Sequence, residues 1–90
     1  MLIPFRTTQF KRDVKLSKKR GRDMLKLQYV MTKLTNEVPL DSKFKDHKLT
    51  GDYKNHRECH IEPDWLLIYQ IKIKEIVFVR LGTHSDLFAN

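Results

Sequence analysis

The stretch that decides the fold is HRECHIEPDWLLIYQIKIKEIVFVRLGT, residues 56–83. It contains three runs of apolar and β-branched residues, with Pro63-Asp64 in the first gap and Lys74-Glu75 in the second. Such short gaps leave room only for hairpins, and Pro and Asp favour tight turns. The pattern therefore predicts an antiparallel meander. Its strands are expected at 56–61, 65–72 and 76–83.

The first part of the chain is predicted to form one strand and two helices. Residues 2–6 indicate a short strand that can pair along an edge of the sheet. Phe10 and Val14, four residues apart, give the first helix a narrow apolar face, and Thr7 or Thr8 can cap its start. A glycine then interrupts the pattern. The second helix follows the 3.6-residue period with Met24, Leu27, Val30, Met31 and Leu34.

The whole chain, residues 1–90, is expected to be a single α+β domain. An N-terminal strand leads into an antiparallel helical hairpin, which packs on one face of a four-stranded, mainly antiparallel sheet. Between residues 36 and 55 the periodicity is lost, which predicts a long loop. Loops of this length in a compact domain are often functional.

Alternation along the last strand assigns its side chains to two faces of the sheet. Val77, Val79 and Leu81 are expected to point toward the helices. Phe78 and Arg80 are expected to point the other way, toward an open face.

The 56–61 strand adds polar groups to the same open face. Cys59 and Ile61 share the buried side, whereas Glu58 and His60 take the open side. The middle strand is apolar on both sides, as a central strand should be. The open face is thus predicted to gather His60, Arg80 and His84.

The positive charge of the chain is concentrated in one segment. The net charge is +7, and the region from Lys11 to Lys26 carries eight basic residues against Asp13 and Asp23. Such an asymmetric field suits a polyanionic partner, either a nucleic acid or an acidic protein. A solvated helical face with no partner is the alternative.

The composition favours a cytoplasmic protein. A single cysteine excludes an internal disulfide and fits a reducing compartment. The apolar start, residues 1–5, is too short for a signal-peptide core, and no apolar run approaches the length of a membrane span.

Four histidines in 90 residues first suggest a metal site. Cys59 and His60 are adjacent, so a strand directs them to opposite faces, and the spacings typical of zinc ligands do not occur. No metal is therefore expected. Cys59 on the inward face is expected to be a packing residue rather than a nucleophile.

General acid–base chemistry on RNA fits these residues better. The ribose 2′-OH can itself attack the neighbouring phosphate, so the protein needs a base, an acid and a cation. A histidine pKa of about 6.5 suits either proton role near neutral pH, and an arginine fork matches phosphate geometry. Trp65 and Phe88 could each stack on an unpaired base, or else pack in the core and against the sheet edge.

Three motifs resemble those of YafQ-type toxins in the RelE/ParE superfamily, whose fold is the α+β arrangement described above. They are KDHKLTG (45–51), YKNHRECHIEPDWLLIYQI (53–71) and VRLGTHSDLF (79–88). The basic stretch VKLSKKRGRDMLKLQYVM (14–31) resembles the helical hairpin of the same family. Together the three C-terminal motifs are specific, although each alone would be weak.

The resemblance implies an mRNA interferase, a ribosome-dependent endoribonuclease that inhibits translation by cutting messenger RNA. It implies a catalytic set in which His84 is the principal proton-transfer residue and Arg80 clamps the phosphate, while Trp65 and Phe88 position the substrate. The full catalytic set is His47, His60, Asp64, Arg80 and His84.

The resemblance also implies partners. They are the messenger RNA, the ribosome with its ribosomal RNA, and a cognate acidic antitoxin, with no cofactor and no membrane. The toxin is expected to be monomeric when free and hetero-oligomeric with its antitoxin. The lysines expected to contact RNA phosphates are Lys11, Lys15, Lys18 and Lys19.

Two other functions are compatible with the fold. One is a ParE-like toxin that inhibits DNA gyrase without cutting RNA, but such an inhibitor needs no cluster of acid–base groups. The other is a non-catalytic basic RNA-binding module, for which an aromatic-rich ribonucleoprotein motif would be expected, and the chain has none.

Overall fold

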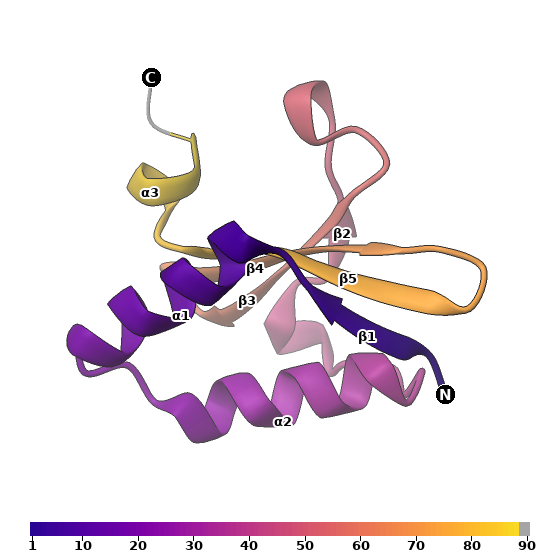
Figure 1. Cartoon of the computed structure of the whole chain (residues 1–90), viewed down its shortest axis with the longest axis horizontal. Helices are drawn as coiled ribbons and strands as arrows, with labels where there is room; N and C mark the ends of the chain where they lie inside the picture. The colour runs from indigo at the N-terminus through magenta and orange to yellow at the C-terminus, as the bar shows by residue number, and fades with distance from the viewer. Residues whose placement is uncertain (89–90) are drawn as a thin grey trace.

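The structure is a computed structural model that describes residues 1–88 (Figure 1). It confirms the predicted α+β class. Among the described residues, no helix is both long enough and apolar enough to cross a membrane. In chain order the elements are β1 (Ile3–Arg6), α1 (Thr8–Lys19), α2 (Met24–Thr35), the short 3-10 helix η1 (Ser42–Phe44), β2 (His47–Lys48), a second 3-10 helix η2 (Gly51–Tyr53), β3 (Arg57–Glu62), β4 (Trp65–Ile71), β5 (Glu75–Gly82) and α3 (His84–Phe88).

The sheet has five strands in the order β1-β5-β4-β3-β2. β3, β4 and β5 form the predicted antiparallel meander, and β1 pairs in parallel with the edge of β5. The fifth strand, β2, lies in the segment predicted to be a loop and pairs antiparallel with β3. It has only two residues, which is too short for an alternating pattern to reveal it.

Both long helices begin where the sequence predicts. Thr7 caps α1, because its Oγ1 accepts a hydrogen bond from the Phe10 amide at 2.9 Å. The same hydroxyl donates to the carbonyl of Val79 at 2.8 Å, which ties the start of α1 to β5. Gly21 turns the chain between α1 and α2 with a φ of +77°, a conformation that favours glycine.

The two faces of the sheet are covered differently. α1 and α2 lie on one side, whereas α3 and the loop that carries η2 rise on the other (Figure 1). The helix-side core includes Phe10, Val30 and Phe78, all at most 1% exposed. A smaller cluster on the open face consists of Leu66, Ile68 and Leu87, with Leu49, Tyr53 and Val79 packed against it.

The predicted faces of β5 are partly wrong. Phe78 packs against Phe10 of α1, with ring centroids 5.8 Å apart, and Val79 belongs to the open-face cluster. Val77 does not join the helix-side core, although Leu81 does, as predicted. The reason is an irregularity in the β4–β5 pairing at Val79, which shifts the alternation by one residue. The predicted faces of β3 are confirmed, with Cys59 and Ile61 in the helix-side core.

Candidate functional site

One row of side chains crosses the open face of the sheet from β2 to β5. The strand register joins His47 to Glu58, Glu58 to Ile68, and Ile68 to Arg80. Residues opposite each other on neighbouring strands present their side chains on the same face. The register therefore brings His47 and Arg80, which are 33 positions apart in the chain, onto one face of the sheet. The carboxylate of Glu58 lies between them.

The next row brings the other two predicted histidines into the same site. It joins His60 to Leu66 and Leu66 to Gly82, and His84 follows where α3 begins. The ring centroids of His60 and His84 lie 5.8 Å apart, and those of His47 and His60 lie 6.1 Å apart. The three imidazoles thus form one continuous cluster.

Glu58 lies beneath this cluster, and sequence reasoning assigned it no role. Its Oε1 is 3.3 Å from Nε2 of His60 and 3.5 Å from Nε2 of His47. The side chain is only 5% exposed, and its buried Oε2 has no hydrogen-bond partner among the described residues. A buried carboxylate needs compensation, and Nε2 of His60 can supply it as a donor. Nδ1 of His47 lies 2.6 Å from the Lys45 carbonyl, which only accepts, so the proton of a neutral His47 ring lies on Nδ1 rather than toward Glu58. Its position two residues before His60 is the signal that could have identified it.

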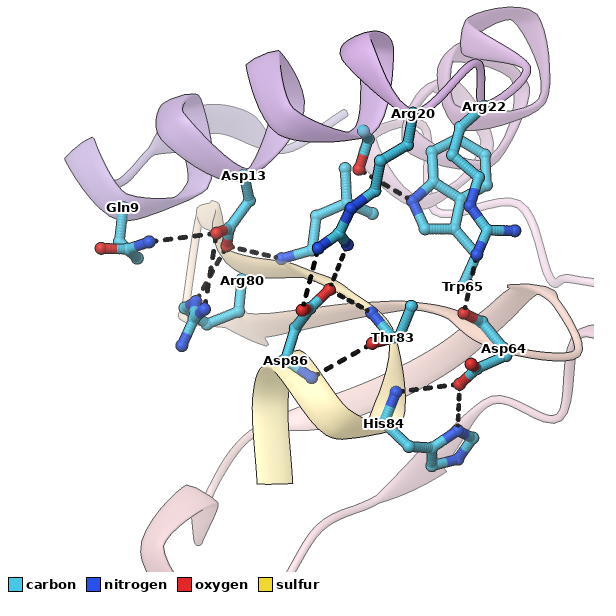
Figure 2. Close-up of polar contacts among 12 residues, drawn as sticks. Gln9, Asp13, Arg20, Arg22, Asp64, Trp65, Arg80, Thr83, His84 and Asp86 are labelled. Carbon is cyan, nitrogen blue, oxygen red and sulfur yellow. Dashed lines mark hydrogen bonds and ion pairs between the residues drawn. The ribbon is translucent and has the colours of Figure 1, made fainter. Parts of the chain in front are cut away.

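Asp64 orients His84 (Figure 2). Its Oδ1 accepts hydrogen bonds from the His84 amide at 2.9 Å and from Nδ1 of the ring at 2.6 Å. The backbone hydrogen bond first, and then the ring, lower the pKa of Asp64. Because a carboxylate only accepts, the proton of the neutral ring lies on Nδ1. Nε2 is then left to exchange a proton with a substrate, and the ring is 55% exposed.

Arg80 is held by a buried carboxylate from α1 (Figure 2). Its Nε donates to Asp13 Oδ2 at 2.8 Å and its Nη2 donates to Oδ1 at 3.4 Å. Asp13 is 6% exposed and also accepts from the Leu81 amide at 3.0 Å and the Gln9 amide group at 3.0 Å. The hydrogen bond to Asp13 raises the pKa of Arg80. Nη1 takes no part in these two hydrogen bonds, so it remains a donor for a phosphate.

In the sequence, Asp13 counts only as one of two negative charges within the basic segment. The signal that it does more is its place three residues after Phe10, on the apolar side of the helix. A buried charge at such a position needs a partner.

The short helix α3 is fixed by a reciprocal pair of hydrogen bonds (Figure 2). The Thr83 amide donates to Asp86 Oδ2 at 3.0 Å, and the Asp86 amide donates to Thr83 Oγ1 at 3.1 Å, as in a capping box. Arg20 at the end of α1 binds the same carboxylate at 2.6 Å. A Cβ added to Gly82 would lie 2.9 Å from that of Asp86, so only glycine fits there. These contacts place His84.

Phe88 lies beside Tyr53, which packs against the open-face cluster. Phe88 is 41% exposed and meets Tyr53 edge-on, with ring centroids 5.9 Å apart. Its role in substrate binding remains a prediction. The four predicted RNA-contacting lysines, Lys11, Lys15, Lys18 and Lys19, are all exposed along α1, and their role is likewise still a prediction.

Trp65 does not have the predicted position. It is 1% exposed and belongs to the helix-side core, where its Nε1 donates to Ser17 Oγ at 3.1 Å and Arg22 lies 5.8 Å from its ring centroid. The prediction that it offers a stacking surface to a base is wrong. β4 begins with this side chain directed at the helices, so the alternative, a core aromatic, is correct.

A set of metal-ligand atoms also occurs in the cluster. One ligand atom each from His47, Glu58 and His60 lies within 4.8 Å of the other two, so these residues could hold a metal ion. Neither the adjacent pair of Cys59 and His60 nor the spacing of the histidines along the chain predicts this set. Cys59 is buried in the core, and desolvation raises the pKa of its thiol. His47 meets Glu58 and His60 only through the pairing of β2 with β3, which the sequence does not reveal.

The fold and the site together define a small basic α+β protein whose open sheet face carries an acid–base cluster beside an arginine. The profile of the YafQ family, bacterial toxins of type II toxin–antitoxin systems, matches residues 3–89. The chain belongs to this family.

Relatives and solved structures are similar over nearly the whole chain. The mRNA interferase toxin YafQ of Escherichia coli strain K12 is 51% identical over 81 residues, covering 89% of this chain and 88% of that protein. A crystal structure of the E. coli DinJ–YafQ complex matches with a TM-score of 0.90 and 46% identity, covering 98% of this chain and 99% of that chain. A metal-bound toxin from Helicobacter pylori matches with a TM-score of 0.91 and 46% identity, covering 98% and 100%.

Proposed function

We propose that this protein cleaves messenger RNA on the ribosome by acid–base catalysis, with the substrate's own 2′-OH as nucleophile. As a YafQ-family protein similar to a named mRNA interferase, it is an endoribonuclease toxin. The observation that carries the mechanism is the His84 ring, polarised by Asp64 at 2.6 Å and clustered with His60 and His47.

The reaction needs one proton acceptor and one proton donor. A histidine of the cluster accepts the proton of the 2′-OH as the bond from O2′ to phosphorus forms. A second histidine donates a proton to the 5′-oxygen as the bond from phosphorus to O5′ breaks. Arg80, preset by Asp13, stabilises the extra negative charge on the phosphorus oxygens. The products are a 2′,3′-cyclic phosphate and a 5′-hydroxyl.

The test uses purified protein, translating ribosomes and a defined messenger RNA, with cut sites mapped by primer extension. A single 2′-deoxyribose at the mapped site should abolish cutting there, and a chelator selective for transition metals should leave the rate unchanged while Mg²⁺ sustains the ribosome. Continued cutting of the deoxy substrate would exclude the 2′-OH as the nucleophile. Loss of activity with the chelator would instead make the His47, Glu58 and His60 set a functional metal site.

The partners form part of the same proposal. The relative crystallised as a DinJ–YafQ complex supports an antitoxin that holds this protein in a hetero-oligomer. The free toxin is expected to be a monomer. A protein that acts on ribosomes is expected in the cytoplasm. The exposed lysines of α1 would dock on ribosomal RNA phosphates, because such contacts position a protein without reading sequence.

The docking face has its own test. Reversing Lys15, Lys18 and Lys19 to glutamate should weaken ribosome binding and flatten its dependence on salt, while the cut sites stay the same. Ribosome affinity is measured across a salt series, and cut sites are mapped in parallel. Unchanged affinity would mean that the face is only solvated, and altered cut sites would mean that it helps read the message.

A further inference from the structure

A groove of about 710 Å³ opens between α2, η1 and β3. His60 of the catalytic cluster forms part of its wall, so the groove begins where the acid–base site ends. Leu25, Lys26 and Tyr29 of α2 line one side, and Lys43 and Lys45 line the other.

The charge of the groove favours an anion. Among the described residues that line it, the only carboxylate is Glu62, which pairs with Arg22 at 3.1 Å and with Lys26 at 3.0 Å. Lys26 first, and then Arg22, lower the pKa of Glu62. Lys43 and Lys45 form no ion pair with any carboxylate in the described part of the chain. The groove therefore presents excess positive charge next to His60.

Apolar surface lies within this positive groove. Leu25 is 75% exposed and Tyr29 is 47% exposed, although both are large and apolar. The Tyr29 ring packs against Phe44, with ring centroids 6.2 Å apart, and this contact limits its movement. A merely solvated lysine face needs no exposed aromatic. Lysines beside an aromatic ring are the combination that binds single-stranded nucleic acid, with phosphates on the cations and a base against the ring.

We propose that this groove holds a nucleotide of the RNA strand that flanks the scissile phosphate. A base lies against Tyr29 and Leu25, and the adjoining phosphate lies near Lys43 and Lys45. The inference rests on the proposed RNA cleavage at the histidine cluster, because His60 connects the two sites. It gives the enzyme a specificity-determining subsite on α2, in place of the predicted contact at buried Trp65.

The first experiment measures binding by amide chemical shifts. The probe is a random-sequence 2′-O-methyl hexaribonucleotide, which the protein cannot cut because the attacking hydroxyl is blocked. The amides of Leu25, Tyr29 and Lys43 should shift together with those of His60 and His84. Shifts confined to the histidine cluster, or to α1 alone, would overturn the subsite.

The second experiment measures cleavage on translating ribosomes at limiting toxin. Tyr29→Ala should lower the cleavage rate about 5- to 150-fold, as expected for the loss of one stacked base, and Tyr29→Phe should restore most of it. Lys43→Glu should also slow cleavage. Lys72→Glu makes the same charge change in the β4–β5 turn, at the opposite end of the sheet from α3 (Figure 1), and should have little effect.

The outcomes separate this inference from the proposed function. If the wild-type protein does not cut RNA, the proposed function fails. If the wild type cuts and Tyr29→Ala and Lys43→Glu match Lys72→Glu, the subsite alone is wrong. Loss of antitoxin binding in Tyr29→Ala with normal cleavage would also overturn it, because the groove would then be a protein interface.

Discussion

The two faces of this sheet are made by the same strands but have different roles. On the helix side, large side chains such as Trp65, Tyr69 and Phe78 are at most 1% exposed and form one core with α1 and α2. On the open side, the apolar cluster is small, and polar groups surround it. One face therefore provides most of the burial, and the other leaves room for a substrate.

The central strand β4 explains how both faces can coexist. Leu67 and Tyr69 pack in the helix-side core, whereas Leu66 and Ile68 form the floor of the open face. Burying β4 on both sides leaves the chemical groups to the neighbouring strands and loops, at His60, Arg80 and His84. Substitutions on the open face should therefore reduce activity, and substitutions on the helix face should reduce stability.

The largest expected effect on the open face is that of His84→Ala. A general acid or base contributes about 10²–10⁴-fold to rate, so cleavage should fall by that factor. The ring is 55% exposed, so the melting temperature should change little. Single-turnover cleavage on ribosomes and thermal unfolding measure the two quantities. A folded variant that cuts as fast as the wild type would remove His84 from the mechanism.

Arg80→Ala tests whether one side chain contributes both to activity on the open face and to stability on the helix side. The rate should fall about 10²–10³-fold, the usual effect of losing one donor to a developing charge. Stability should also fall, by about 1–3 kcal/mol, because buried Asp13 loses its ionic partner. A side chain that only lined the open face could be removed without a change in stability. The ion pair with Asp13 is the reason to expect a loss for Arg80. Urea unfolding of the variant decides between the two.

Asp13→Asn is the matched variant. It keeps Arg80 but weakens the contact that presets it. The rate at saturating substrate should fall while substrate affinity changes less, because Asp13 is only 6% exposed. If Asp13→Asn lowers the cleavage rate by the same factor in the wild type and in Arg80→Ala, Asp13 does not act through Arg80.

Trp65→Phe sharpens the comparison from the helix side. It removes the hydrogen bond to Ser17, which should cost about 1 kcal/mol in the free energy of unfolding. Cleavage per folded molecule and the mapped cut sites should not change, since the ring is 1% exposed. A change in cut sites at unchanged stability would restore Trp65 to the substrate site.

Much of the fold was predictable because local signals agree with it. Pro63-Asp64 marks the β3–β4 turn, Thr7 caps α1, and Gly21 separates the two helices. The faces of β5 were not fully predictable, because the irregularity at Val79 depends on pairing with β4 and has no local signature. The same holds for β2, whose two residues are a strand only because β3 lies beside them.

The catalytic side chains of the site could be predicted from the sequence, but the residues that hold them in place could not. Histidine and arginine stand out by type and spacing, so His60 and His84 could be expected near Arg80, whereas His47 was expected there only from the family resemblance. Asp13 supports Arg80 from α1, 67 positions earlier in the chain, and only the tertiary fold brings the two together. The prediction for Trp65 was wrong because an aromatic residue at the start of a strand fits either face of the sheet, and only the strand register decides which face it takes.

The smallest expected effect concerns the ion pair between the two faces, which joins Arg20, directly after α1, to Asp86 on α3. The hydrogen bond from Arg20 first, and then that from the Thr83 amide, lower the pKa of Asp86 from 3.8 to about 2. Since the folded pKa is the lower one, the stabilisation is fully present above the ordinary value and is lost as the pH falls toward 2. Asp86→Asn should therefore cost about 1 kcal/mol near neutral pH, in the range of partly exposed ion pairs.

The decisive measurement is how this difference in stability depends on pH. Urea unfolding of wild type and Asp86→Asn between pH 6 and pH 2 should show two curves that converge at the acid end, because the wild-type carboxylate becomes protonated there. Arg20→Gln, which removes only the cation, should give a similar curve and leave the Thr83 contacts intact. A constant gap down to pH 2 would mean that Asp86 acts by shape alone. Convergence would instead show that a charge pair joins the helix-covered face to the helix that carries His84.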